Sequence, residues 1–203
     1  MDDRQSAAIK VLEIDALKLK TVWVNSESER TLRVSKLESL AVGSKFLTCT
    51  SLDGSVRILD PELGTVLAKV DLKSISDTVA LSPNEGSIVA GTRQGDLLVL
   101  NVPSGKVRQT IHAHDEAVTA VTFAASDLIV SGSRDRKLKF WKIHKDGIVS
   151  EILTLGPLSD HVSELAASDD GNVVAVLVND ETAVRILRVD LLRERLREYE
   201  LDW

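Results

Sequence analysis

Short runs in which apolar and polar residues alternate recur along the chain. Each run ends in a similar four-residue segment: an apolar residue, usually Lys or Arg, then a β-branched or aromatic residue, then a large apolar residue. This near-alternation is typical of a β-strand with one buried face. The copies are IKVL ending at Leu12, VRIL at Leu59, LLVL at Leu100, LKFW at Trp141 and VRIL at Leu187, spaced 41 to 47 residues apart.

Further apolar runs surround these marker segments and repeat with them. The run just before the marker segment lies at 45–51, 87–92, 128–133 and 172–178. An earlier run in the same repeat lies at 77–86, 117–127 and 162–171. A last run follows the marker segment at 65–72 and 106–114. Short turns such as LDGS and RQGD, in which Gly54 and Gly95 can supply a positive φ, predict hairpins. Four short antiparallel strands in a repeat of this length are typical of a β-propeller blade, which must stack on its neighbours to bury its faces.

The predicted fold is therefore all-β, built of β-propeller blades of four antiparallel strands and followed by a short C-terminal α-helix. Three blades are complete and two are partial. Within a propeller segment of residues 1–190, the blades are expected at about 34–72, 73–114, 115–160 and 161–190, with a partial N-terminal blade at 8–30.

The last residues have a different pattern, rich in Leu, Arg and Glu. We expect a helix over 191–203 with Asp190 as its N-cap. Its apolar residues fall on one face at Leu192, Leu196 and Tyr199. A helix this short is marginal alone, so it should cap the last blade or dock on a partner.

The segment SGSRDRKLKFWKI at 131–143, preceded by HAHDEAVTAVTF at 112–123, resembles a WD-repeat blade, and residues 80–106 resemble the same family with Leu100 in place of the Trp. The resemblance covers about residues 8 to 190. It implies a buried hydrogen-bonded chain in one blade, formed by His114, Ser131, Asp135 and Trp141. A buried indole N–H and a buried hydroxyl both need partners, which such a chain supplies.

Ser131, His114 and Asp135 are also the residue types of a hydrolase triad. However, the chain has no Gly-x-Ser-x-Gly elbow, and Ser131 lies in an apolar strand, so we expect no catalytic residues. The sister repeats carry other residues at these positions: Cys49 and Ala90 for the serine, Asp53 and Gln94 for the aspartate, and Leu72 near one histidine position. The joint loss of partners in the repeat that contains Leu100 is typical of a structural network.

Composition narrows the partner classes. The chain is 43% hydrophobic and 28% charged, as in soluble globular proteins, and its net charge of −6 gives no general attraction for nucleic acid or anionic membranes. The single cysteine, Cys49, excludes a disulfide within the chain. The N-terminus lacks an apolar signal region, and no run approaches a membrane span, so we expect a cytoplasmic protein.

Other candidate sites are weak. His112, His114 and His161 have no carboxylate or cysteine at a recurring ligand spacing, and no phosphate-binding loop is present, so no metal and no cofactor are expected. Arg134 and Arg136 lie on a turn of the predicted rim and form a candidate partner-binding surface. The alternative, a solvated turn, is favoured because no aromatic residues accompany them.

The sequence therefore predicts a non-enzymatic scaffold that binds protein or peptide partners. Its last residues, with a final Leu-Asp-Trp, resemble the end of planctomycete-type bacterial WD-repeat proteins, which implies the sensor or assembly propeller of a bacterial regulatory protein. The alternative is a ligand-binding or hydrolytic propeller with an axial site. Because four to five blades are few for a ring, the chain is expected to be a fragment of a longer protein; the alternatives are a homodimer that completes a ring and an open arc.

Overall fold

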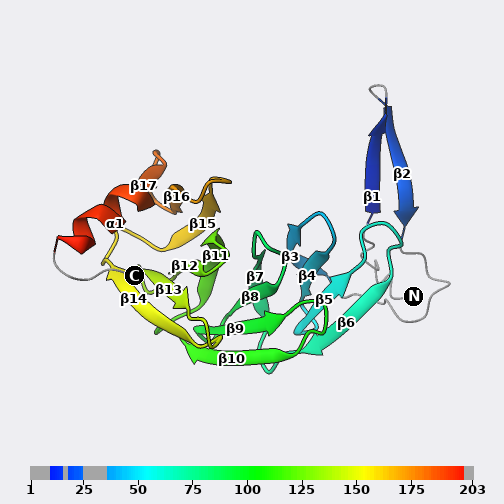
Figure 1. Cartoon of the computed structure of the whole chain (residues 1–203), viewed down its shortest axis with the longest axis horizontal. Coiled ribbons are helices and arrows are strands. Elements are labelled where there is room, and N and C mark those ends of the chain that lie inside the picture. Colours follow the sequence, from blue (N-terminus) through cyan, green and yellow to red (C-terminus); the bar gives the residue numbers. More distant parts are fainter. Residues whose placement is uncertain (1–9, 16–17, 25–35, 199–203) are drawn as a thin grey trace.

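The computed structural model describes residues 10–15, 18–24 and 36–198 of the chain. These residues form antiparallel sheets and one short helix, and each larger sheet consists of strands that follow one another in the sequence. Figure 1 shows the four larger sheets in chain order along a curved row. The predicted all-β fold with four-stranded antiparallel sheets and a short C-terminal helix is confirmed.

The strand bounds are as follows. The first sheet contains β3 (Leu37–Val42), β4 (Leu47–Ser51), β5 (Ser55–Leu59) and β6 (Val66–Asp71), and the second contains β7 (Ser76–Leu81), β8 (Ser87–Thr92), β9 (Asp96–Asn101) and β10 (Val107–His112). The third contains β11 (Val118–Ala125), β12 (Leu128–Ser133), β13 (Leu138–Ile143) and β14 (Val149–Leu155), and the last contains β15 (Val162–Ala167), β16 (Val173–Val178) and β17 (Arg185–Arg188).

Two further strands, β1 (Lys10–Asp15) and β2 (Lys18–Val24), pair with each other as a hairpin. They lie inside the partial blade expected at 8–30, of which residues 8, 9, 16, 17 and 25–30 lie outside the described part of the chain. Each of the other four predicted blade ranges contains one of the four larger sheets.

The core lies between neighbouring sheets. The first strand of each sheet packs on the first strand of the next, β3 on β7, β7 on β11 and β11 on β15. One apolar cluster joins the first two sheets through Val56, Ile58, Val79, Ile88 and Leu100. Such stacking buries the apolar faces that a single sheet would leave in water.

Two glycines on second strands allow this close approach. A Cβ atom on Gly91 would overlap the Val118 side chain, and one on Gly132 would overlap the Val162 side chain. Each glycine therefore accommodates a valine of the next sheet, because neither position has room for both side chains.

The last sheet has three described strands, and the helix α1 (Val189–Arg197) follows its third strand. Val189 is buried, and its N–H donates to the Asn172 carbonyl at 2.8 Å. Leu192 packs against the same apolar cluster as Val189, while Leu196 is half-buried. The helix thus packs on the last sheet, which was one of the two alternatives expected from the sequence; the other was docking on a partner.

The predicted N-cap, Asp190, is wrong. The N-cap is Arg188, which makes no side-chain capping bond, and Asp190 lies in the first helical turn. Strand β17 ends at Arg188 and the helix begins at the next residue, so no capping residue intervenes. The Asp190 carboxylate instead accepts hydrogen bonds from Arg188 Nε at 3.0 Å and Nη2 at 2.6 Å. Tyr199 lies outside the described residues.

The part of the chain that the structure describes contains no helix long and apolar enough to cross a membrane.

Candidate functional site: the Asp135 turn and its buried network

One hairpin and one loop of the third sheet bring four predicted residues together. Ser131 lies on β12 and Trp141 on β13, Asp135 is in the turn between these strands, and His114 is in the loop that joins β10 to β11. Strand pairing aligns Ser131 with Lys139 and Ile129 with Trp141, so the indole reaches the serine diagonally across the hairpin.

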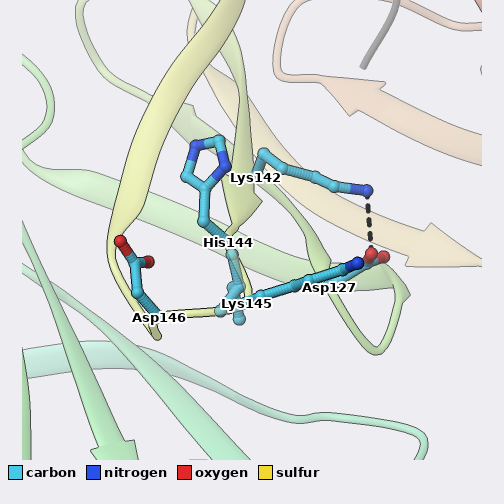
Figure 2. Close-up of a pocket in the computed structure, with 6 residues that line it drawn as sticks. Asp127, Lys142, His144, Lys145 and Asp146 are labelled. Carbon is cyan, nitrogen blue, oxygen red and sulfur yellow. Dashed lines mark hydrogen bonds and ion pairs between the residues drawn. The ribbon is translucent and has the colours of Figure 1, made fainter.

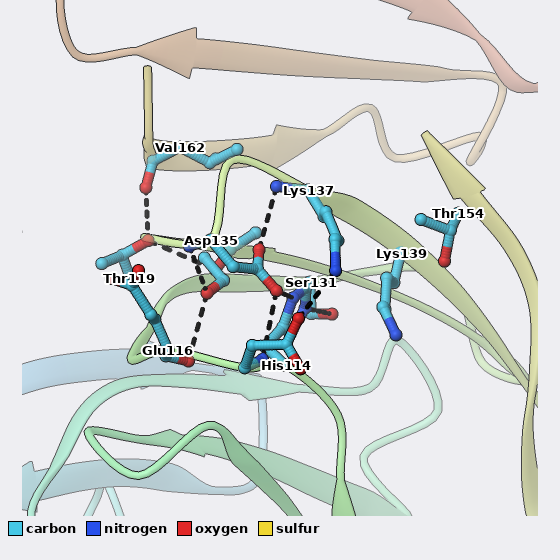
Figure 3. Close-up of polar contacts among 12 residues, drawn as sticks. His114, Glu116, Thr119, Ser131, Asp135, Lys137, Lys139, Thr154 and Val162 are labelled. Atoms are coloured by element: carbon cyan, nitrogen blue, oxygen red, sulfur yellow. Dashed lines mark hydrogen bonds and ion pairs between the residues drawn. The ribbon is translucent and has the colours of Figure 1, made fainter. Parts of the chain in front are cut away.

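The four side chains form a continuous hydrogen-bonded chain. His114 Nδ1 lies 3.0 Å from Asp135 Oδ2, and His114 Nε2 lies 2.8 Å from Ser131 Oγ. Trp141 Nε1 donates to the same Ser131 Oγ at 2.9 Å. Figure 3 shows His114 with Asp135 and Ser131, the two residues that its ring nitrogens contact. With Nδ1–H donating to Asp135, the serine hydroxyl donates to Nε2 and accepts from the indole, so each polar group has a partner.

The network is closed to solvent. The exposed fraction is 0% for Ser131, 2% for His114 and 3% for Trp141, and 5% for the side chain of Asp135. Burial lowers the pKa of His114 below its ordinary value, although the Asp135 carboxylate opposes this effect. The imidazole is therefore neutral at pH 7, as required for Nε2 to accept the serine proton.

Asp135 also organises the surrounding backbone. Its carboxylate accepts from the N–H of Asp115 at 3.2 Å and from the N–H of Lys137 at 2.9 Å. Its own N–H donates to Ser133 Oγ at 3.1 Å. One buried side chain thus fixes both the turn and the loop that enters the sheet.

The described cavities lie away from Ser131. One, of about 620 Å³, is lined by Asp127 and residues 142–146, and Figure 2 shows the Lys142 to Asp127 ion pair at its edge. A second, of about 170 Å³, is lined mostly by apolar side chains such as Leu138, Leu155 and Val176. Neither is lined by Ser131, which is fully buried.

The first sheet carries a different set of residues at the corresponding positions. Cys49 is completely buried, and burial raises the pKa of its thiol to about 11. Burial alone would raise the pKa of Asp53, but hydrogen bonds from Ser55 and Arg57 lower it to about 2. Arg57 Nη2 lies 2.8 Å from Asp53 Oδ2, and the arginine is only 2% exposed.

Sequence reasoning missed this ion pair between a buried arginine and an exposed aspartate. Arg57 occupies the second marker position, where Lys or Arg recurs, and only its four-residue spacing from Asp53 could have signalled the contact. In the second sheet, Ala90 and Leu100 are buried, Leu72 is half-buried and Gln94 is exposed, so no corresponding network forms among them.

The two rim arginines are both exposed on the turn that Asp135 fixes. Arg136 has φ 63°, in the left-handed region, where the equivalent turns of the first two sheets have Gly54 at 76° and Gly95 at 86°. Two neighbouring lysines are already ion-paired, Lys137 with Asp115 and Lys139 with Glu151, both at 2.8 Å.

The histidines considered as metal ligands are separated by their contacts. His112 lies 3.0 Å from Asp96, His114 belongs to the network, and His161 lies 3.2 Å from Asp160. Within residues 10–15, 18–24 and 36–198, no group of three His, Cys, Asp or Glu side chains could hold a metal ion.

Comparison with known proteins places this hairpin in a family. Residues 105–142 match the family described as "WD domain, G-beta repeat". Ribosome biogenesis protein YTM1 of Eremothecium gossypii is 31% identical over 140 residues, 68% of this chain and 28% of that protein. Autophagy-related protein 16 of Arabidopsis thaliana is 30% identical over 126 residues, 60% of this chain and 24% of that protein. The chain thus spans about a quarter of the length of these relatives.

Solved structures show the same fold. The WD40 repeats of RRP9 superpose with a TM-score of 0.63 at 21% identity, covering 78% of this chain and 52% of that one. The computationally designed Ika4 protein superposes with a TM-score of 0.64 at 22% identity, covering 76% of this chain and 91% of that one. The relatives are eukaryotic, so the expected bacterial, planctomycete-type origin finds no support among them. The family match and these relatives support assigning the chain to the WD40 repeat family.

Proposed function

We propose that this chain is a non-catalytic scaffold whose loops bind protein or peptide partners. The observation that carries the proposal is the closed network of His114, Ser131, Asp135 and Trp141, whose distances are all 3.0 Å or less. Its role is structural: it holds the hairpin, the turn and the entering loop in one arrangement. A rigid turn presents side chains to a partner at low entropic cost.

The geometry argues against the hydrolytic alternative. A catalytic serine needs a hydroxyl that is open to a substrate, with hydrogen-bond donors placed for the oxyanion. The Ser131 hydroxyl is fully buried and contacts both His114 and Trp141. A substrate could reach it only if the hairpin opened.

The names of the relatives favour a general binding function for the repeat over a single enzymatic activity. Their names refer to ribosome biogenesis, autophagy and pre-mRNA processing, and one is a putative E3 ubiquitin-protein ligase. Processes this different share the repeat but no common chemistry, as expected if the repeat supplies binding surfaces.

We also propose a location for this chain and the classes of partner that it binds. A cytoplasmic location is consistent with one buried cysteine, and the net charge of −6 disfavours nucleic acid and membrane partners. A role as the sensor or assembly propeller of a bacterial regulator depends on the resemblance of the last residues alone. A homodimer that completes a ring remains part of the proposal.

The test is stoichiometric binding. Proteins that the purified chain captures from cells of its source would be produced recombinantly and titrated by calorimetry against wild type and Ser131→Ala. We expect a partner that binds near one to one, with Ser131→Ala retaining affinity where circular dichroism shows that it is folded. A hydrolytic activity that Ser131→Ala abolishes while the fold persists would overturn the proposal, as would the absence of any partner that binds stoichiometrically.

A further inference from the structure

Two neighbouring sheets carry an arginine in the same place, directly after the second strand. The N–H of Arg93 donates to the Ile75 carbonyl at 3.0 Å, and the N–H of Arg134 donates to the Ala117 carbonyl at 3.0 Å. Each arginine therefore leaves the backbone beside the first strand of its own sheet. The two positions can be compared directly, because the same backbone contact fixes both.

In the second sheet the arginine is neutralised. Arg93 Nε donates to both carboxylate oxygens of Asp77, at 2.9 and 2.7 Å. Asp77 lies at the irregular position near the start of β7, where the strand register shifts between Ser76 and Thr78. The sheet thus supplies its own carboxylate.

In the third sheet that carboxylate is replaced. The register of β11 shifts between Val118 and Ala120, and Thr119 occupies the position that corresponds to Asp77. Its hydroxyl donates to the backbone carbonyl of Gly132 at 3.2 Å and to that of Val162, the second of which Figure 3 shows. In the described part of the chain, the exposed guanidinium of Arg134 makes no hydrogen bond or ion pair.

Arg136 adds an independent observation. It holds the left-handed φ of 63° that the sister turns assign to glycine, a conformation that is strained for a residue with a Cβ atom. The turn is held by the Arg136 N–H donating to the Ser133 carbonyl at 3.3 Å and by the Leu158 N–H donating to the Arg136 carbonyl at 2.8 Å. Backbone strain of this kind tends to cluster at functional sites.

We propose that Arg134 and Arg136 bind an acidic peptide segment of a protein partner through its carboxylate side chains. This inference depends on the scaffold function proposed above. Guanidinium groups bind carboxylates through paired hydrogen bonds. Among the described residues, neither Arg134 nor Arg136 has a carboxylate partner, so the two together suit a segment with at least two carboxylates. Lys137 and Lys139 are not proposed as ligands of the peptide, because each already forms an ion pair with a carboxylate of this chain.

The surrounding charge favours a short acidic segment over a polyanion. Asp115 and Glu116 are exposed beside the turn, and the whole chain carries a net charge of −6. A long polyanion such as nucleic acid would extend from the turn onto this negative surface, whereas a short acidic peptide can place its carboxylates at the two arginines alone. The contact should also weaken with added salt, because the site is exposed.

The probe for the test is fluorescently labelled hexaglutamate, with hexaglutamine as the uncharged control, measured by fluorescence anisotropy. We expect the purified chain to bind hexaglutamate and not hexaglutamine, with Arg134→Gln weakening binding about tenfold, the loss of one charge-assisted contact. The matched control is Arg93→Gln, which removes the paired arginine and should leave the affinity unchanged. Equal losses in both variants, or no binding of hexaglutamate by wild type, would overturn the inference.

Arg136→Gly separates binding from folding. Glycine relieves the left-handed strain, so the Tm should be no lower than that of wild type, while the affinity for hexaglutamate falls. Unchanged affinity in Arg136→Gly would count against the site, and so would binding of a phosphoserine peptide in the absence of hexaglutamate binding. If hexaglutamate fails while a stoichiometric partner still binds, only this inference is lost; if no partner binds, the scaffold proposal itself fails.

Discussion

At the scale of single residues, the main determinant is the network around Ser131. A buried polar group that loses its partner costs more free energy than the bond itself contributes, so the network responds as a unit. Ser131 has two partners and Asp135 has contacts to His114 and two backbone N–H groups. Substitutions here should therefore affect stability rather than a chemical rate.

Trp141→Ala is expected to lower the free energy of unfolding by roughly 3 to 5 kcal/mol, because it empties a buried site and leaves Ser131 with one partner fewer. Urea denaturation followed by circular dichroism measures the change. Trp141→Phe, which keeps most of the ring but loses the indole N–H, should cost less. A loss below about 1 kcal/mol for Trp141→Ala would contradict the packing described here.

His114 makes stability depend on pH. Its pKa is lowered in the folded protein, so the unfolded chain binds the proton more tightly, and the stability that the neutral ring contributes is lost as the pH falls below its ordinary value of 6.5. Denaturation midpoints at about pH 7 and pH 5 should show this fall, since most carboxylates titrate below that range. His114→Gln should flatten the dependence, and a stability that falls equally between pH 7 and pH 5 in this variant would contradict the role of His114.

At the scale of elements, the contacts between sheets decide which sheets can be neighbours. Gly132 has no room for a Cβ atom because Val162 fills the space. Glu85, in the turn between β7 and β8, accepts from the N–H groups of Ser44, Lys45 and Phe46 at 2.9, 2.9 and 3.0 Å, and so binds the turn of the preceding sheet. Packing and hydrogen bonding therefore both act across each boundary.

Gly132→Ala is expected to lower the free energy of unfolding by about 1 to 3 kcal/mol through overpacking against Val162. Adding Val162→Ala should recover part of the loss, because the smaller side chain makes room. A double-mutant cycle by urea denaturation measures the coupling. Strictly additive effects of the two changes would show that the side chains do not compete for this space.

Glu85→Gln should loosen the join between the first two sheets. Burial would raise the pKa of Glu85, but the hydrogen bonds from residues 44–46 lower it overall, so the carboxylate is charged at neutral pH. Hydrogen exchange should show faster exchange at the amides of Lys45 and Phe46 and little change at those of the third sheet. Unchanged protection at both amides would exclude this role for Glu85.

At the scale of the whole molecule, the last sheet carries exposed apolar residues on and beside its outer strands, as the first sheet also does at Leu40 and Val42. Leu177 on β16 is 37% exposed, Val184 is 55% exposed and Ile186 on β17 is 58% exposed. Grouped apolar exposure of this kind promotes association, whereas single exposed apolar residues on a surface are ordinary.

Ile186→Glu is therefore expected to reduce self-association of the chain while leaving its Tm nearly unchanged. Static light scattering over a range of protein concentrations measures the average mass. Leu67→Glu, at a 47% exposed position on β6, is the matched control and should leave the mass unchanged. An equal effect of both substitutions would point to net charge, rather than this surface, as the cause.

The sequence was sufficient for the repeated part of the fold, because period and alternation are local signals. It also identified the residues that the structure brings together at Ser131. It failed at Asp190, where the end of a strand decides the start of the helix, and at Arg57, whose burial depends on what covers that face of the first sheet. The sequence also could not predict that, in the described residues, Arg134 lacks the carboxylate partner that Arg93 has, because this contrast depends on strand register.

The glycine and valine pairs between sheets have a consequence for how such a chain can grow. The second and third sheets each accommodate a valine of the next sheet beside a glycine, Val118 at Gly91 and Val162 at Gly132. Leu177 occupies the corresponding place on β16. A further sheet that packed on β16 would therefore need a residue smaller than valine at this place.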